Sequence, residues 1–306
     1  MGPKRKQADQ ADAAEDPWLR HPTPKRAKEI DEHPPYNELQ EVLEKNNSDT
    51  KARNVLHWFR KDLRLEDNTA LHHASQKAKE GSGSLITVFL HTPKDMQWHG
   101  TSPARSDFML ESLRILQKQL EDKHIPLAIV EAPERRDKTD KLLKFVEDND
   151  ISHMYANMEY EIDELRRDIR IATRIQDKTL SFEILHDETV MEPLTLTGSG
   201  GGPIKVFTPY HKAWLAETKS NPSLYDTHPA PDDNDKKASQ DLKKLFGSKI
   251  PGLPGDKQFE SKDDEKKMRK LWPAGNEAGM KRLSDFLNKK VFARPCVASL
   301  VITDMS

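Results

Sequence analysis

The sequence is short of the residues on which several kinds of protein depend. Its 306 residues include one cysteine, Cys296, which excludes an internal disulfide and a zinc site built on several cysteines. No apolar run approaches the roughly 20 residues that cross a bilayer, and the N-terminal stretch lacks the apolar core of a secretion signal. These absences predict a soluble protein of a reducing compartment, with no membrane partner.

An excess of charge of one sign is also missing. Charged residues make up 33% of the chain, yet the formal net charge is −2. Neither sign therefore draws the whole molecule to nucleic acid, and a charged partner must meet a local patch. The length predicts about two domains, and we expect a monomer.

Residues 1–52 contain few β-branched or aromatic side chains and many Lys, Asp, Glu and Pro residues. Such a segment does not recover the backbone entropy of about 1 kcal/mol or more per ordered residue, so we predict a disordered arm. Its two basic clusters, Lys4-Arg5-Lys6 and Lys25-Arg26-Ala27-Lys28, are typical of nuclear-import signals. They predict a nuclear protein, while a solubilising tail and a cytoplasmic location stay open.

Apolar runs of strand length alternate with longer segments of helical spacing from residue 54 onward. The clearest helix begins with Ser102 as the N-cap and Pro103 at its first position. Its apolar face consists of Met109, Leu113, Leu116 and Leu120. The strand-like runs are 54–59, 84–90, 127–131, 153–158 and 181–186. This alternation predicts a doubly wound (Rossmann-like) α/β domain with a parallel five-stranded sheet over residues 54–220.

The pattern changes after the last predicted strand. The glycine-rich loop 198–202 does not lie between the first strand and its helix, which favours a flexible connection over a phosphate-binding loop. Residues 221–262 are rich in Pro, Asp, Lys and Ser and predict a long, poorly ordered linker. Helical spacing returns at 263–290. The apolar face there contains Met280, Leu283, Phe286 and Leu287.

The stretch HWFRKDLRLEDN, residues 57–68, places six charged residues directly after the first predicted strand. Ligands of open parallel sheets bind beyond the carboxyl ends of the strands, where this cluster belongs. The stretch lacks the glycines of a dinucleotide-binding turn, which disfavours a nicotinamide-dependent dehydrogenase. A self-paired loop is the alternative, with Asp67 capping the next helix. Its ion pairs would join Arg60 and Arg64 to Asp62 and Glu66.

This stretch resembles the opening motif of the DNA photolyase and cryptochrome family, in which the first strand ends in W-F-R-x-D-L-R-x-x-D-N. Further similar motifs follow in the family's order, and the closest resemblance is to the fungal-type photolyases that repair cyclobutane pyrimidine dimers. These motifs lie at 102–110, 158–167, 205–215 and 271–275.

The resemblance implies an N-terminal α/β domain that can hold an antenna chromophore, followed by a helical domain that binds FAD and the dimer in UV-damaged DNA. Residues 263–290 are similar to the start of that helical domain, whereas the tail 291–306 matches nothing in the family. We therefore expect a truncated chain that lacks the FAD-binding half, contains no catalytic residue and is inactive by itself. Its affinity for UV-damaged DNA should be weak or absent.

In folate-binding relatives, an acidic pair holds the pterin of methenyltetrahydrofolate. That pattern falls on Asp163 and Glu164, after Tyr160-Glu161-Ile162. Carboxylates accept well from the N–H donors of a pterin edge, and a helix start favours negative charge. Some relatives have asparagine at the first position, so Asp163 is the weaker match. Both acids could instead serve only their helix, since Asp163 and Arg167 are four residues apart.

Several alternatives remain beside a photolyase. A non-catalytic, cryptochrome-like light-sensing or binding module would use the same α/β domain. The antenna could be a deazaflavin in place of a folate, and the tail 291–306 could be natural or an artefact of the gene model.

Overall fold

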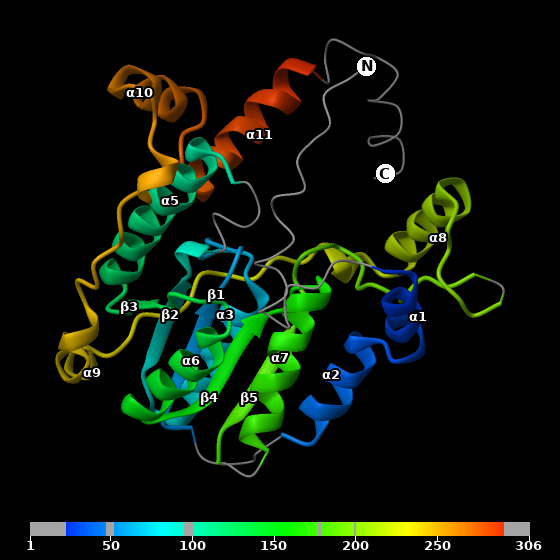
Figure 1. The fold of residues 1–306 in the computed structure, drawn as a ribbon, viewed down its shortest axis with the longest axis horizontal. Coiled ribbons are helices and arrows are strands. Elements are labelled where there is room, and N and C mark those ends of the chain that lie inside the picture. The colour runs from blue at the N-terminus through cyan, green and yellow to red at the C-terminus, as the bar shows by residue number, and fades with distance from the viewer. Residues whose placement is uncertain (1–22, 47–51, 95–100, 177–178, 199, 291–306) are drawn as a thin grey trace, which may run out of the picture. The chain divides into compact units, whose positions relative to one another are not determined.

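The computed structural model describes residues 23–46, 52–94, 101–176, 179–198 and 200–290 (Figure 1). The chain divides into two compact units, Met1–Asp49 with Glu159–Phe182 and Thr50–Met158 with Glu183–Ser306. The basic cluster at residues 4–6 and the tail 291–306 lie outside the described residues. None of the described helices is long and apolar enough to cross a membrane.

A five-stranded sheet in the order β3-β2-β1-β4-β5 organises most of the second unit. The strands are β1 (Asn54–Phe59), β2 (Leu85–His91), β3 (Leu127–Glu131), β4 (Ile151–Asn157) and β5 (Ser181–Leu185). β1 pairs in parallel with β2 and with β4, and β2 pairs in parallel with β3. The boundary between the units falls inside β5. The predicted doubly wound parallel sheet is confirmed, with small shifts at the strand ends.

The sheet helices of this unit are α3 (Thr69–Gly81), α5 (Pro103–Asp122) and α6 (Asp137–Asp148). Right-handed crossovers place α3 and α5 on one face of the sheet and α6 on the other. The apolar sides of α3 and α5 share one buried core with Val55, Phe59 and Leu85. Ser102 caps α5 as predicted, because its hydroxyl accepts from the Arg105 N–H at 3.2 Å. The predicted face of α5 is buried, except that Met109 is only half-buried.

The first unit contains α1 (Pro24–Glu32), α2 (Pro35–Glu44) and α7 (Ile162–Ile175). α2 packs against α7, with Leu39 fully buried and the Asn46 amide donating to the Ala172 carbonyl at 2.8 Å. The prediction of a disordered arm is therefore wrong for residues 24–44. The polar average composition of this segment concealed a helix that starts at Pro35. Burial of Leu39 stabilises the folded state by about 1.5–3 kcal/mol.

The linker is held against the sheet, contrary to the prediction of a poorly ordered connection. The Asn234 amide accepts from the Leu85 N–H at 2.9 Å and donates to the Leu85 carbonyl at 2.8 Å. The Ser248 hydroxyl accepts from the Ile129 N–H of edge strand β3 at 2.9 Å. Side chains thus satisfy backbone groups that no further strand pairs. The short helices of this segment are η2 (Pro222–Tyr225), α9 (Lys236–Asp241), η3 (Lys243–Leu245) and η4 (Gly255–Lys257).

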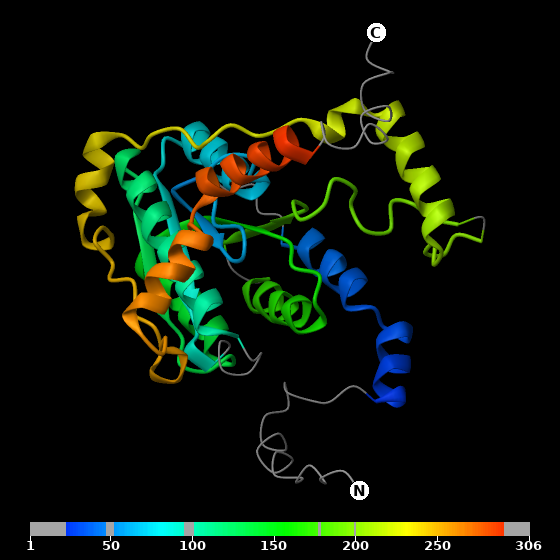
Figure 2. The ribbon, with the colours of Figure 1, turned by 90° about the horizontal axis from the view of Figure 1, so that it is seen from above.

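Before the linker lies α8 (Phe207–Ser220), and after it the predicted helical stretch forms two helices, α10 (Lys262–Leu271) and α11 (Asn276–Lys290). The break between them contains Pro273 and Gly275, whose φ of 90° favours glycine. Figure 2 shows α10 beside α5, and Glu277 in the first turn of α11 accepts from the Gln119 amide of α5 at 3.1 Å. The predicted apolar face of α11 is exposed. Its members are Met280, Leu283, Phe286 and Leu287.

Candidate functional site

The carboxyl ends of β1 and β4 are where this fold is expected to place a ligand. The chain winds from β1 out to β3 and then returns to β4 on the other side of β1, so the strand order reverses between β1 and β4. Open α/β sheets bind ligands in the crevice at such a reversal. The charged loop 60–68 follows β1 at this point.

Asn157, the last residue of β4, holds the loop after β1 in place. Its amide donates to the Asp62 carboxylate and, at 2.8 Å, to Asn68 Oδ1. Its own Oδ1 accepts from the Ala70 N–H at 2.9 Å. Asn68 in turn caps α3 by accepting from the Leu71 N–H at 3.1 Å. One buried amide therefore joins β4 to both the loop and the helix that follows it.

The predicted cap of α3, Asp67, is wrong by one residue. Asp67 has a φ of 51°, and its N–H donates to the His228 carbonyl at 2.7 Å. An N-cap needs an extended backbone, which Asn68 has and Asp67 lacks.

The two loop arginines also reach partners far away in the sequence. Arg60 is buried and donates to the Asn157 carbonyl at 2.9 Å. Arg64 forms an ion pair with Asp187 rather than with the predicted acids of its own loop. Asp187 also accepts from the Thr69 N–H and hydroxyl, at 3.0 and 2.7 Å. These polar groups are used to fix the loop to the ends of the strands. The interpretation as a structural loop is therefore favoured, but Arg64 pairs with Asp187 outside the loop and not with Asp62 or Glu66.

His57 on β1 lies close to the same carboxylate. Its Nε2 is 3.9 Å from Asp62 Oδ2, too far for a hydrogen bond, and neither ring nitrogen has a hydrogen-bond partner among the described residues. Burial lowers the pKa of His57 from 6.5 to about 4, because losing water penalises the imidazolium more than Asp62 stabilises it. His57 is therefore neutral at pH 7, and its contact with Asp62 is not an ion pair.

The predicted antenna residues Asp163 and Glu164 lie together in the first turn of α7. Asp163 is exposed and Glu164 is half-buried. One turn further on, buried Arg167 pairs with Glu159 at 3.0 Å and with Asp168 at 2.9 Å. Burial opposes the charge of Arg167, but the surrounding acids raise its pKa above the ordinary value. The helix thus brings two carboxylates to its N-terminus, beside an anchored arginine. Their chromophore stays a prediction.

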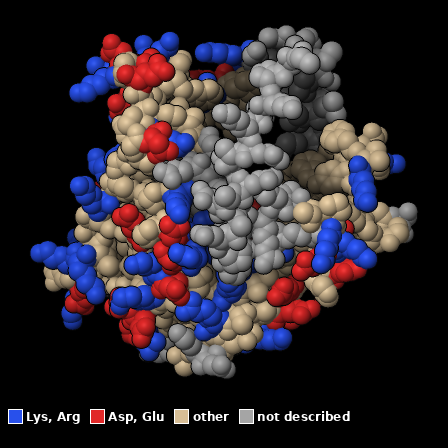
Figure 3. Space-filling view, viewed as in Figure 1, with Lys and Arg blue, Asp and Glu red and all other residues tan. Residues whose placement is uncertain are grey.

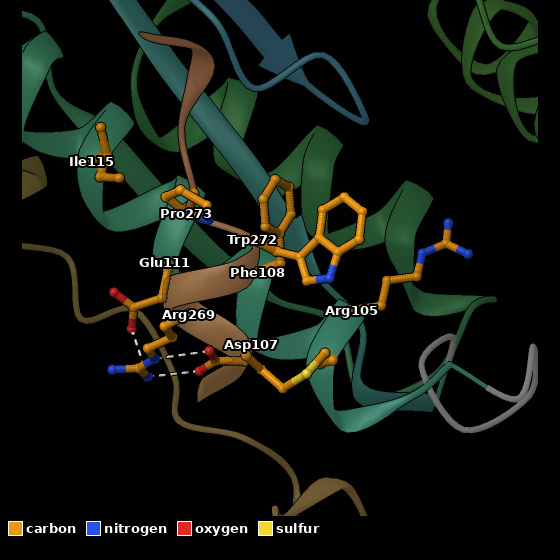
Figure 4. Close-up of a pocket in the computed structure, with 11 residues that line it drawn as sticks. Arg105, Asp107, Phe108, Glu111, Ile115, Arg269, Trp272 and Pro273 are labelled. Carbon is orange, nitrogen blue, oxygen red and sulfur yellow. Dashed lines mark hydrogen bonds and ion pairs between the residues drawn. The ribbon is translucent and has the colours of Figure 1, made fainter. Parts of the chain in front are cut away.

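A second candidate site is a pocket of about 550 Å3 between α5 and the connection from α10 to α11 (Figure 4). Phe108 and Trp272 are its aromatic walls, 42% and 55% exposed. On one side, Arg269 donates two hydrogen bonds to Asp107, at 2.8 and 2.7 Å. Arg105 lies on the other side of the aromatic pair. Sequence analysis missed this pocket because Asp107 and Arg269 are 162 positions apart. Among the described residues, no group of three or more His, Cys, Asp or Glu side chains could hold a metal ion.

Comparisons with known proteins agree with the motif resemblance. The family model for DNA photolyase matches residues 55–232. A deoxyribodipyrimidine photo-lyase of Neurospora crassa is 35% identical over 242 residues, which are 78% of this chain and 39% of that protein. A deoxyribodipyrimidine photo-lyase of Salmonella typhimurium is 31% identical over 167 residues, 54% of this chain and 34% of that protein.

Two solved structures share the fold. A class III photolyase from Agrobacterium tumefaciens has a TM-score of 0.60 at 22% identity, covering 79% of this chain and 46% of that one. A Synechocystis cryptochrome has a TM-score of 0.57 at 19% identity, covering 78% of this chain and 47% of that one. At these identities the similarity concerns the fold alone.

The chain spans less than half the length of each of these relatives. The family match nevertheless covers more than half of the chain and contains all of the sheet except Asn54, together with the Asn157 network and the acidic pair of α7. It contains α5 but not the residues of α10 that complete the pocket. On the strength of this match, the chain belongs to the DNA photolyase family.

Proposed function

We propose that this chain is the antenna part of a deoxyribodipyrimidine photolyase, which uses light to split cyclobutane pyrimidine dimers in DNA. The observation that carries this proposal is the 35% identity to the Neurospora enzyme over 242 residues. The similarity to a cryptochrome is one of fold, so it does not favour light sensing over repair.

In this proposal, this chain holds the antenna and a FAD-binding helical domain carries out the catalysis. The matched residues account for 39% of the Neurospora protein. The described residues after the linker form two helices, α10 and α11, which are too few to enclose and tune a flavin. We therefore assign no catalytic residue here. In this proposal the chain by itself is inactive and binds UV-damaged DNA weakly or not at all.

Asp163 and Glu164 are the residues that we assign to the antenna. The N–H donors of a methenyltetrahydrofolate pterin need acceptors, and ionised carboxylates are acceptors only. Both acids lie at the N-terminus of α7, where the helix dipole favours negative charge. Arg167 is anchored by Glu159 and fixes the start of the helix beneath them. A bound folate would supply near-ultraviolet absorption, and a deazaflavin is the competing antenna.

Light-driven repair tests the division of work. The purified chain is compared with the same chain joined to the helical domain of the Neurospora enzyme, in blue light and in the dark. We expect the joined protein to retain FAD and to split dimers only in the light, and the chain alone to do neither. Stoichiometric FAD on the chain alone would contradict the division. A joined protein that retains FAD without splitting dimers would contradict the photolyase assignment.

A folate titration tests the antenna separately. Replacing Glu164 by Gln keeps the size of the side chain and removes its charge, so we expect methenyltetrahydrofolate to bind about tenfold more weakly. Glu147→Gln is the matched control, because Glu147 is exposed on α6 in the other unit. Equal folate affinity of both variants would show that Glu164 does not bind the folate. Tight binding of a deazaflavin without folate binding would favour the competing antenna.

Nuclear import is the third part of the proposal. The cluster Lys25–Lys28 lies on α1, with Lys25 and Lys28 exposed, and Lys28 is 3.6 Å from Glu32. Exposure leaves these side chains within reach of an import receptor. A fluorescent fusion should lose nuclear enrichment in the Lys25→Ala, Lys28→Ala double variant. Unchanged enrichment would exclude this cluster as the signal.

A further inference from the structure

The pocket between α5 and α10 is held open by specific contacts rather than by loose packing. Besides its two hydrogen bonds to Asp107, Arg269 lies 3.0 Å from Glu111 and 2.9 Å from Glu265. The Asp107 side chain is nearly buried, so this ion pair fixes the end of α10 against α5. The walls are therefore positioned before any ligand arrives.

The lining of the pocket is mainly apolar. Its apolar members are Ala104, Phe108, Ile115, Met268, Trp272, Pro273 and Ala274. Phe108 and Trp272 both line this pocket, and both are substantially exposed. Isolated exposed aromatic rings are common, but two beside one cavity of about 550 Å3 offer a stacking surface of ligand size.

Arg105 is the cation that this pocket leaves available. Its guanidinium has no ion pair or hydrogen bond among the described residues, although Arg105 lies at the edge of the lining. The neighbouring arginines are occupied. Arg114 binds Glu111 and the Pro251 carbonyl, and Arg282 lies 4.2 Å from the centre of the Trp272 ring. Figure 4 shows its guanidinium beyond Trp272 and directed outward, so an anion at the mouth of the pocket would find its partner at Arg105.

The opposite end of the pocket carries negative charge. Glu111 uses Oε1 for both Arg114 and Arg269, so these two contacts leave its Oε2 unused. Glu111 lies six residues after Arg105 on α5, which separates the two positions by about 9 Å along the helix. The pocket thus has an acceptor at one end, aromatic walls between, and a cation at the other end.

We propose that this pocket binds a planar aromatic ligand with an anionic group. The ring stacks against Trp272 and Phe108, the anion pairs with Arg105, and any N–H donor on the far edge of the ring meets Glu111. A nucleoside monophosphate and a free aromatic carboxylic acid share this chemistry. The site is independent of the antenna assignment, because none of its residues belongs to α7.

Binding of the fluorescent probe anilinonaphthalene sulfonate to the purified chain tests this proposal. We expect Arg105→Gln to weaken the probe about tenfold, while the uncharged analogue phenylnaphthylamine binds this variant as it binds the native chain. Trp272→Ala should weaken both probes. Lys118→Gln, an exposed cation elsewhere on α5, and Phe286→Ala, an exposed ring on α11, are the controls and should change neither affinity by more than twofold.

Two further results decide the proposal. Equal affinity for the sulfonate in the Arg105→Gln and Lys118→Gln variants would overturn it. An equal loss of probe affinity in Trp272→Ala and Phe286→Ala would also overturn it, because the probe would then bind exposed apolar surface nonspecifically. Displacement by adenosine monophosphate supports a nucleotide ligand, and displacement by indole acetate supports an aromatic acid. Displacement by neither at millimolar concentration would also overturn it. Native circular dichroism of each variant shows that the fold is intact.

Discussion

The amide nitrogen of Asn157 lies 2.8 Å from the side-chain oxygen of Asn68, and this hydrogen bond ties the end of β4 to the cap of α3. Both side chains are buried, so water cannot take the place of either hydrogen-bond partner if the other is lost. The loop of charged residues between β1 and α3 depends on this contact for its position.

Replacing Asn157 by Ala should lower the free energy of unfolding by about 2–4 kcal/mol, because it removes one buried hydrogen bond each from Asp62, Asn68 and the Ala70 N–H. Urea unfolding followed by circular dichroism measures the change. Asn288→Ala on the exposed side of α11 is the control and should stay within about 0.5 kcal/mol. A loss below 1 kcal/mol for Asn157→Ala would show that the network is not needed.

The stability of the fold should depend on pH through His57. Its folded pKa is about 4, against 6.5 in the unfolded chain, so between these values the unfolded chain binds a proton that the folded chain does not. The stabilisation from neutral His57 is complete above pH 6.5 and is lost as the pH falls towards 4, by about 3 kcal/mol.

His57→Leu should flatten this part of the pH profile in urea unfolding experiments at closely spaced pH values. Some slope should remain, because burial also lowers the pKa of His91 and of His153. His211→Gln changes an exposed histidine and should keep the native profile. A native slope in His57→Leu would mean that other groups cause the acid sensitivity.

The ion pair of Arg269 and Asp107 should join α10 to the sheet domain. Arg269→Ala leaves the nearly buried Asp107 carboxylate without its partner. Because the Arg269 side chain is 44% exposed, we expect the free energy of unfolding to fall by only about 1–2 kcal/mol. The Asp107→Ala, Arg269→Ala double variant should lose less than the sum of the single changes. Strictly additive losses in thermal unfolding would show that the two side chains do not act as a pair.

The sequence predicted the structure correctly where its patterns are periodic and local. The alternation of apolar runs gave the sheet, and Ser102 with Pro103 marked the start of α5. Reasoning failed where a partner lies far along the chain. Spacing rules pair residues three or four apart, so they assigned local partners to Arg64 and missed Asp187, 123 positions away. The pocket was missed for the same reason.

The prediction of a disordered arm at the N-terminus was wrong for residues 24–44 because it used the average composition of the segment. Residues 1–52 are polar on average, yet the stability of α2 depends on one buried leucine, Leu39, and its contact with α7. An average over a long window hides a single apolar stripe. The antenna role proposed for Asp163 and Glu164 likewise rests on the family motif alone, since acids are common in the first turn of any helix.

Two glycines near the pocket should respond in opposite ways to alanine. Gly275 has a φ of 90°, and an added Cβ would lie 3.1 Å from the Ile115 Cδ1 atom, so Gly275→Ala combines backbone strain with crowding. We expect Gly275→Ala to lower the free energy of unfolding by about 1–3 kcal/mol and to speed hydrogen exchange in α10 and α11. Gly279 lies inside α11 with open space around its Cβ position, so Gly279→Ala should stabilise that helix by up to about 1 kcal/mol and slow its exchange. Because both changes add the same methyl group, a loss in both variants would indicate that α11 tolerates no added volume, and the left-handed turn at Gly275 would then not be the cause.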